Sequence, residues 1–172
     1  MLALSSGVKA LQLLAVLATA LLLGTTFAPV LEMPSQLAMS GSLWSAVQRA
    51  VVYPFMVVGG PLEIGTIVIN LAVLAAALSR PQLLFFTAGS TLSLVLAFAV
   101  WVLFTQPASL QVMSWGDGPL PADWSQWRAE WEFSQLIRFL LHLTGLLLLV
   151  SSLLNISIEE SPRSGVVHRS HG

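Results

Sequence analysis

Four long stretches of apolar residues, separated by short polar segments, dominate the hydropathy pattern of this chain. They cover residues 10–31, 55–78, 82–104 and 136–156. Each has about the 20 residues that an α-helix needs to cross a hydrocarbon layer of about 30 Å. The apolar positions are continuous and do not alternate, so the pattern indicates helices and not the strands of a membrane barrel. We therefore expect an all-α protein, a bundle of four transmembrane helices.

The first stretch has a second interpretation, because Lys9 precedes it and small residues follow it, as in a secretory signal peptide. Two features favour a retained helix. The stretch from Ala10 to Leu31 is longer than the apolar core of about 7–15 residues in a signal peptide. Pro29 also follows directly on the candidate cleavage site. We expect this helix to remain in the mature protein.

The segments between the apolar stretches predict three connections. Residues 32–53 form a polar-to-amphipathic connection. Ser79–Pro81 is expected to be a tight turn, with Pro81 at the first position of the next helix. Residues 105–107 should end the third helix, because residues 108–122 are rich in glycine and proline and predict a loop.

The fourth helix is expected to begin well before its apolar stretch. Asp123 is a good N-cap, and Gln126 stands three residues later, as in a capping box. One helix over residues 124–157 would be about 50 Å long, so its first turns should project from the membrane. Residues 1–158 then form one transmembrane domain, and residues 159–172 a polar tail that we expect to be disordered.

Composition and charge support a membrane location. The chain is 56% hydrophobic and 9% charged, whereas a soluble domain carries about 25% charged residues. Its net charge of −1 offers no electrostatic footprint for nucleic acid. There is no cysteine, so thiolate ligands and disulfides are excluded. We expect no metal site and no cofactor.

The basic residues favour one orientation in the membrane. Lys9, Arg80 and the arginines of the C-terminal tail lie on the side shared by both termini, whereas Arg49 and Arg128 lie on the other side. The positive-inside rule therefore predicts that both termini are cytoplasmic.

Polar residues in the apolar stretches are the strongest candidates for function, because they are costly in lipid and usually face a bundle interior. The fourth helix carries such residues at steps of three or four, which places them on one face: Arg128, Trp131, Gln135, Arg138, His142 and Gly145. The second helix carries Glu63, Thr66 and Asn70 on one face. Neither stripe is stable against lipid, so we expect the two stripes to face each other.

The facing stripes predict one pocket lined by Glu63, Arg138 and His142, with Gln135 and Trp131 at its mouth. Each lining residue keeps an alternative role. A break of the second helix at residues 59–61 could leave Glu63 in a first helical turn near headgroups. Arg138 could extend to the membrane interface. His142 could be a hydrogen-bonded core residue, although histidine is the side chain that most readily takes up a proton near neutral pH.

Residues 121–138, PADWSQWRAEWEFSQLIR, resemble a family of small four-helix membrane proteins that includes the fungal anthrone oxygenases. That family has a polar-Pro-polar end to its third helix, a tryptophan, and then W-x-x-x-R-x-x-W-E-x-x-H-x-x-R at the start of the fourth helix. The matching residues here are Gln106–Ser109, Trp115, Trp124, Arg128, Trp131, Glu132 and Arg138. The order of the four helices extends the resemblance to about residues 8–156.

Two departures from the family pattern matter. Gln106 and Ser109 stand where the family often has asparagines, and Gln135 stands at the family's histidine. Glutamine keeps the hydrogen bonding but cannot take up a proton at neutral pH. If that histidine is a base, His142, two turns along the same face, would have to replace it.

The resemblance implies cofactor-independent oxygenation of a polycyclic phenol. A deprotonated anthrone carbon would react directly with dioxygen, which requires a general base, donors for the enolate oxygen and aromatic walls. This hypothesis assigns His142, with Arg138 and Glu63, to catalysis. It assigns substrate binding to Trp131, Gln135, Arg128, Asn70 and Gln106.

Three classes of function follow. The first is the oxygenase, acting on an aromatic small molecule. The second is a non-catalytic protein: an accessory subunit of a membrane complex, which includes pairing with a second copy, or a small-molecule-binding bundle. The third, a transporter or channel, is disfavoured by the absence of an internal repeat and by too few intramembrane charges. A cavity lined by Trp131, Arg138 and Glu63 would favour the first class, and a tightly packed interior the second.

Overall fold

The computed structural model describes residues 6–116 and 118–160, without the side chains of residues 52–56, 82 and 155–160. Helix α1 covers Ser6–Ala38 and α2 covers Gly41–Ala77. A third rod is continuous from α3 (Pro81–Val100) through the π-helical segment η1 (Trp101–Thr105) into α4 (Gln106–Ser114). The fourth rod is α5 (Trp124–Glu160).

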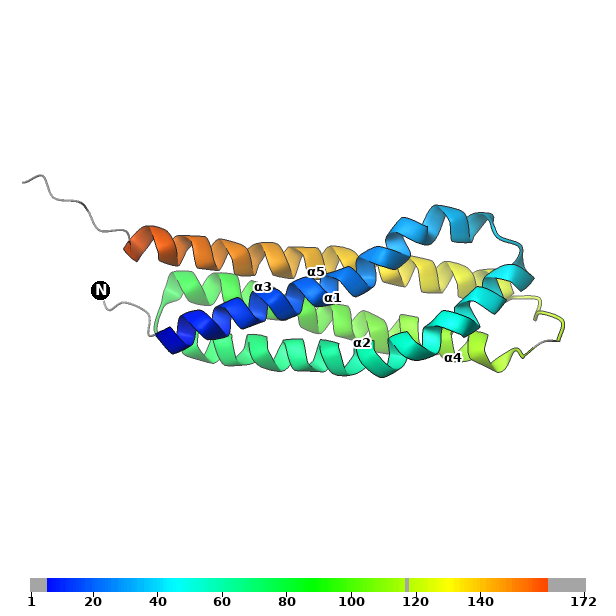
Figure 1. Ribbon diagram of the computed structural model, residues 1–172, viewed down its shortest axis with the longest axis horizontal. Helices are drawn as coiled ribbons and strands as arrows, with labels where there is room; N and C mark the ends of the chain where they lie inside the picture. The colour runs from blue at the N-terminus through cyan, green and yellow to red at the C-terminus, as the bar shows by residue number, and fades with distance from the viewer. Residues whose placement is uncertain (1–5, 117, 161–172) are drawn as a thin grey trace, which may run out of the picture.

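The four rods lie side by side and alternate in direction (Figure 1). Helix α5 packs against α1 and α3, and α2 also packs against α1 and α3. The start of α1 and the end of α5 therefore lie at the same end of the molecule (Figure 1). Four helices are long and apolar enough to cross a membrane. The predicted all-α class with four long apolar helices is confirmed.

The predicted connection over residues 32–53 is wrong, because that segment is almost entirely helical. Helix α1 extends to Ala38 and α2 begins at Gly41, so two residues join them. Ser40 is the N-cap of α2, and its hydroxyl accepts a hydrogen bond from Leu43 N–H at 3.4 Å. The alternative of a break at residues 59–61 is also excluded, because α2 is continuous there. A continuous helix satisfies its own backbone groups, which a break in apolar surroundings would leave unpaired.

The expected end of the third helix at residues 105–107 is wrong as well. Pro107 has no N–H, and its ring crowds the carbonyl four residues earlier. The helix widens before it: Gln106 N–H bonds to the carbonyl of Trp101, five residues back, in the π-helical segment η1. The rod then continues as α4, and the predicted loop over residues 108–122 is reduced to the segment after Ser114, where Gly116 has a φ of 62°.

Two predicted boundaries are confirmed. Pro81 occupies the first turn of α3, and α5 begins at Trp124. The Asp123 carbonyl accepts a hydrogen bond from Gln126 N–H at 2.9 Å, and its carboxylate accepts one from the Trp127 indole at 3.0 Å. Helix α5 continues to Glu160, so the first two residues of the predicted tail are helical. Residues 161–172 of that tail lie outside the described residues.

The interior of the bundle is largely polar and its outer surface apolar. Buried hydrogen bonds join Gln12 to Ser152, and Asn70 to both Thr19 and Ser90. Large apolar side chains are exposed on all four rods, among them Leu21, Leu71, Phe85, Leu103 and Leu147. This is the reverse of a soluble protein, in which apolar side chains fill the core. It is the arrangement expected where lipid supplies the apolar surroundings and polar contacts join the helices.

Candidate ligand site

A buried ion pair joins α5 to α2 in the middle of the bundle. Arg138 Nη2 lies 2.6 Å from Glu63 Oε2, and both side chains are almost fully buried. His142 Nε2 lies 3.4 Å from the other oxygen of Glu63. The opposite ring nitrogen of His142 shares a hydrogen bond of 3.1 Å with the Thr26 hydroxyl on α1. Three helices are thus joined through one carboxylate and one imidazole.

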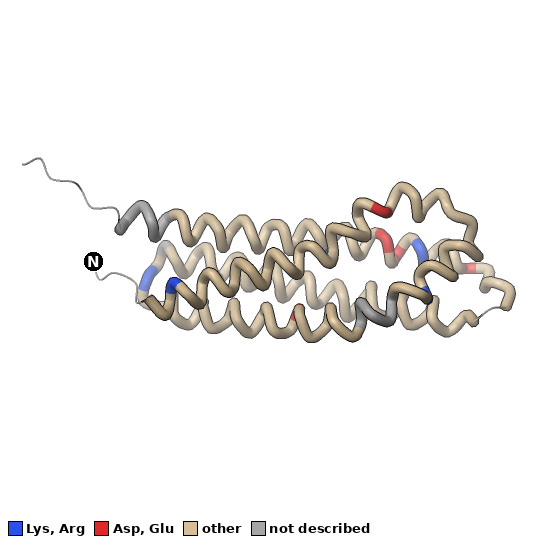
Figure 2. The backbone as a smooth tube through the Cα atoms, viewed as in Figure 1, with Lys and Arg blue, Asp and Glu red and all other residues tan. Residues whose placement is uncertain are grey.

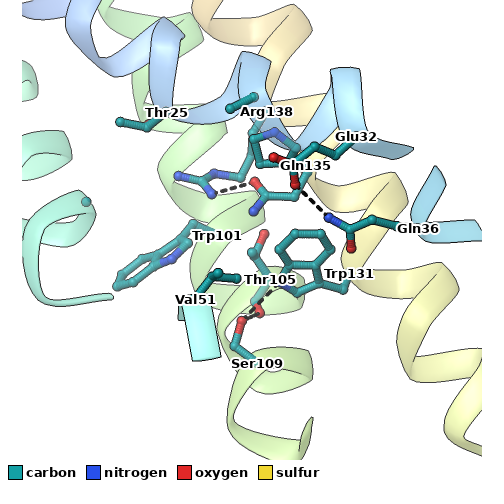
Figure 3. Close-up of a pocket in the computed structure, with 13 residues that line it drawn as sticks. Thr25, Glu32, Gln36, Val51, Trp101, Thr105, Ser109, Trp131, Gln135 and Arg138 are labelled. Carbon is teal, nitrogen blue, oxygen red and sulfur yellow. Dashed lines mark hydrogen bonds between the residues drawn. The ribbon is translucent and has the colours of Figure 1, made fainter. Parts of the chain in front are cut away.

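A cavity of about 110 Å³ lies beside this ion pair. All four rods contribute to its lining (Figure 3). Trp101 and Thr105 come from η1, and Trp131, Gln135 and Arg138 from α5. The remaining lining residues are Thr25, Ala28, Pro29, Glu32 and Gln36 on α1, Val51 and Gly59 on α2, and Ser109 on α4.

The cavity lies where two of the rods depart from regular α-helix. Pro29 and Pro34 are inside α1, and a proline inside a helix removes a hydrogen bond and kinks the rod. Helix α1 bends in its last third (Figure 1). On the third rod, the π-helical segment contributes Trp101 and Thr105 to the lining. The proline kink of α1 and the π-helical segment of the third rod therefore keep these two rods from packing tightly against each other beside the ion pair.

Hydrogen bonds fix most polar groups around the cavity. Arg138 Nη1 donates to Gln135 Oε1 at 3.0 Å, and the Trp131 indole donates to the Ser109 hydroxyl at 3.2 Å (Figure 3). The Thr105 hydroxyl donates to that of Ser134 at 2.9 Å. The tryptophan and arginine side chains are thus held in fixed orientations, as a preformed binding site requires.

Gln36 connects the cavity to a second buried polar cluster, formed by Gln36, Trp44, Gln48 and Glu132. Its amide nitrogen donates to Glu32 at 3.0 Å, and its oxygen accepts hydrogen bonds from Trp44 and Gln48. The Trp44 indole also lies 3.4 Å from Glu132 Oε1. This cluster ties the end of α1 to α2 and α5, and so fixes one wall of the cavity.

The structure brings the two predicted stripes together, with Glu63 on α2 paired to Arg138 and beside His142 on α5. The pocket differs from the prediction, however. Arg138, Gln135 and Trp131 line the cavity, whereas Glu63 and His142 do not. Both are completely buried behind Arg138, because their polar atoms are directed at Arg138, at Thr26 and at each other.

The other predicted binding residues lie away from the cavity. Asn70 is buried among Thr19, Thr66 and Ser90. Arg128 donates to the carbonyls of Gln36 and Met39 at the end of α1, and its guanidinium lies 4.7 Å from the centre of the Trp124 ring. Gln106 is half-buried and is not part of the lining.

Several lining residues were missed by the sequence analysis. Trp101, Thr105 and Ser109 recur at steps of four and thus share a face of the third rod. Glu32 and Gln36 share a face of α1 in the same way. This spacing could have indicated that these residues line one site. It was not recognised because residues 105–109 were predicted to be a helix end and loop, and residues 32–36 a connection.

No protein-family model, curated protein or solved structure matches this chain in comparisons with known proteins. The resemblance to anthrone oxygenases therefore depends on the sequence motifs alone: residues 106–109, Trp115 and the segment 121–138. Within the described part of the chain, no three histidine, aspartate or glutamate side chains gather as metal ligands would.

The ion pair yields a prediction about stability. Glu63→Gln or Arg138→Gln alone leaves one buried charge without its partner, and each should lower the free energy of unfolding by about 3–5 kcal/mol. The double variant should lose clearly less than the sum of the two. Thermal unfolding in a fixed detergent measures all three.

Arg128→Gln combined with Glu63→Gln is the control for this cycle. Arg128 bonds to backbone carbonyls on α1 and shares no partner with Glu63. Those two losses should add. Additive losses for Glu63→Gln and Arg138→Gln would mean that the ion pair does not form.

Proposed function

We propose that this chain is a multi-pass membrane protein whose four rods all extend beyond the hydrocarbon layer at the end opposite the termini. Helices of 33 and 37 residues, such as α1 and α2, are about 50–55 Å long, against about 30 Å of hydrocarbon. Charged residues gather towards both ends of the molecule and are sparse between them (Figure 2). This distribution supports an end outside the hydrocarbon that includes the first turns of α5 and parts of the other rods.

We further propose that both termini are cytoplasmic, as the positive-inside rule favours. Single cysteines can test this, because the chain has none of its own. Ser79 is exposed in the turn between α2 and α3, and Gly118 is exposed before α5 at the other end. A membrane-impermeant thiol reagent applied to intact cells should label Gly118→Cys and leave Ser79→Cys unlabelled. Labelling of Ser79→Cys alone would reverse the orientation.

The function that the geometry supports best is binding of a small aromatic molecule taken from the membrane. The observation that carries this proposal is the cavity itself, with two tryptophans, an arginine and two glutamines among its lining residues. Its volume of about 110 Å³ approaches the 150 Å³ of an engineered protein cavity that binds benzene. One ring therefore fits better than the three fused rings of an anthrone.

We propose that a ligand enters the cavity between α1 and α2. Glu32 and Val51 line the cavity and are also exposed on the outside of the bundle. A hydrophobic molecule dissolved in the membrane would then reach the cavity from the side of the bundle.

A matched pair of glycine variants tests the binding site. Gly59 lines the cavity, and a Cβ atom added there would meet no atom within 4 Å. Gly24 is equally open but does not line the cavity. Leucine at position 59 should fill the site and abolish binding, whereas leucine at position 24 should not.

The measurement is the rise in melting temperature on adding 4-propylphenol, a single-ring probe. Saturation at about 100 times Kd stabilises a protein by about 2.7 kcal/mol. The parent protein and Gly24→Leu should show the rise, and Gly59→Leu should not. An equal rise in all three proteins would place binding elsewhere.

The resemblance to anthrone oxygenases supports a second candidate, oxygenation of a phenolic substrate in the same cavity. Because Glu32 lines the cavity and His142 does not, the base that contacts the substrate would be Glu32. A general base contributes about 10²–10⁴-fold to a rate. With an anthrone supplied, of which only the phenolic ring would have to enter the cavity, Glu32→Gln should lose that factor in oxygen uptake. Glu130→Gln, which alters a carboxylate outside the cavity, should retain full uptake. No uptake by the parent protein would remove this candidate.

A further inference from the structure

The charges around the cavity do not favour an anion. Arg138 is the one cationic side chain among the lining residues that the structure describes, and its charge is cancelled by Glu63 at 2.6 Å. Arg138 and Glu63 together therefore bring no net charge to the cavity. Glu32 also lines the cavity and has no cationic partner among the lining residues. An anion would therefore lose its hydration and meet a net negative lining.

The groups still able to form hydrogen bonds include both donors and an acceptor. Gln135 gives its oxygen to Arg138, and its amide nitrogen finds no acceptor among the described residues. Arg138 Nε also has no hydrogen-bond partner, although that atom is itself buried. The Glu32 carboxylate accepts one hydrogen bond, from Gln36, and has capacity for more.

A ligand that suits this set has one group that both donates and accepts. A hydroxyl on a ring donates to Glu32 and accepts from Gln135 or Arg138, and it brings no charge into the cavity. A carboxylate only accepts, so it leaves Glu32 opposed by a like charge. A ligand without a polar group leaves the buried donors of Gln135 and Arg138 unpaired.

On this basis, and given the proposed binding function, we infer that the cavity selects an uncharged single-ring molecule with a hydroxyl-type head over an anion of the same size. Arg138 then acts as a neutralised hydrogen-bond donor and not as an anion receptor. Glu32 acts as the residue that rejects anions.

Three probes of similar size test the selectivity: 4-propylphenol, 4-propylbenzoate and propylbenzene. Their affinities for the full chain in lipid nanodiscs at pH 7 are measured by calorimetry and referred to the concentration of each probe in the membrane. The phenol should bind about tenfold or more tightly than either of the others, because charge-assisted hydrogen bonds are worth at least that factor.

Glu32→Gln identifies the residue responsible. Removing this carboxylate should tighten benzoate binding about tenfold, since one like charge is gone, and weaken phenol binding severalfold. Glu130→Gln removes a carboxylate that does not line the cavity and should change neither affinity. An unchanged ratio of phenol to benzoate affinity in Glu32→Gln would overturn the role given to Glu32.

The outcomes separate this inference from the proposed function. If none of the three probes binds, the binding function itself fails. If the benzoate binds more tightly than the phenol, the cavity is a ligand site but the inference about charge is overturned. Equal binding of propylbenzene and the phenol would also overturn it, because the polar head would then not be recognised.

Discussion

The ion pair between Arg138 and Glu63 is the contact on which the rest of the bundle depends. Each side chain is almost fully buried, and neither is stable in apolar surroundings without the other. The pair fixes the position of α5 along the axis of α2. His142 and Thr26 extend the same network to α1. Apolar side chains face outward on every rod, so these polar contacts, together with small buried apolar clusters, determine which helix faces which.

The cavity beside the ion pair is produced by irregular helix geometry. A straight α1 and a regular α3 would let the rods pack together along their whole length. The prolines of α1 and the π-helical segment before Pro107 prevent this. Prolines and π-bulges reduce helix stability, and π-bulges are frequent at functional sites. Their position at the cavity supports its role as a binding site.

The charges around the cavity change the role that Arg138 can have. From the sequence alone, an arginine in an apolar stretch suggests a receptor for anions. That role would agree with the oxygenase mechanism, in which a cation stabilises an enolate. In the folded chain its charge is already matched by Glu63, and Glu32 brings a further negative charge to the lining. This charge balance supports the proposed preference for a neutral ligand with a hydrogen-bonding head. Any base acting on that ligand has to be found among the residues that line the cavity.

Hydropathy and local helix-start signals were enough to predict the helical class, the four long apolar helices, the turn at Pro81 and the start of α5. These features depend on local chemistry: continuous apolar residues, a proline at a helix start, and an aspartate before one. The facing of the Glu63 and Arg138 stripes also followed from sequence, because a charged stripe in an apolar helix needs a polar partner.

Only the tertiary structure determined which residues line the cavity. Helicity over residues 32–53 and through Pro107 depends on neighbouring rods that pack against those segments, and a local pattern does not contain that information. For the same reason, sequence could not tell that Glu63 and His142 lie behind Arg138, or that Glu32 and Trp101 meet at one cavity. Periodicity gives the face of a helix on which a residue lies, but the bend of α1 and the π-helical turn of the third rod determine which faces leave a space between them.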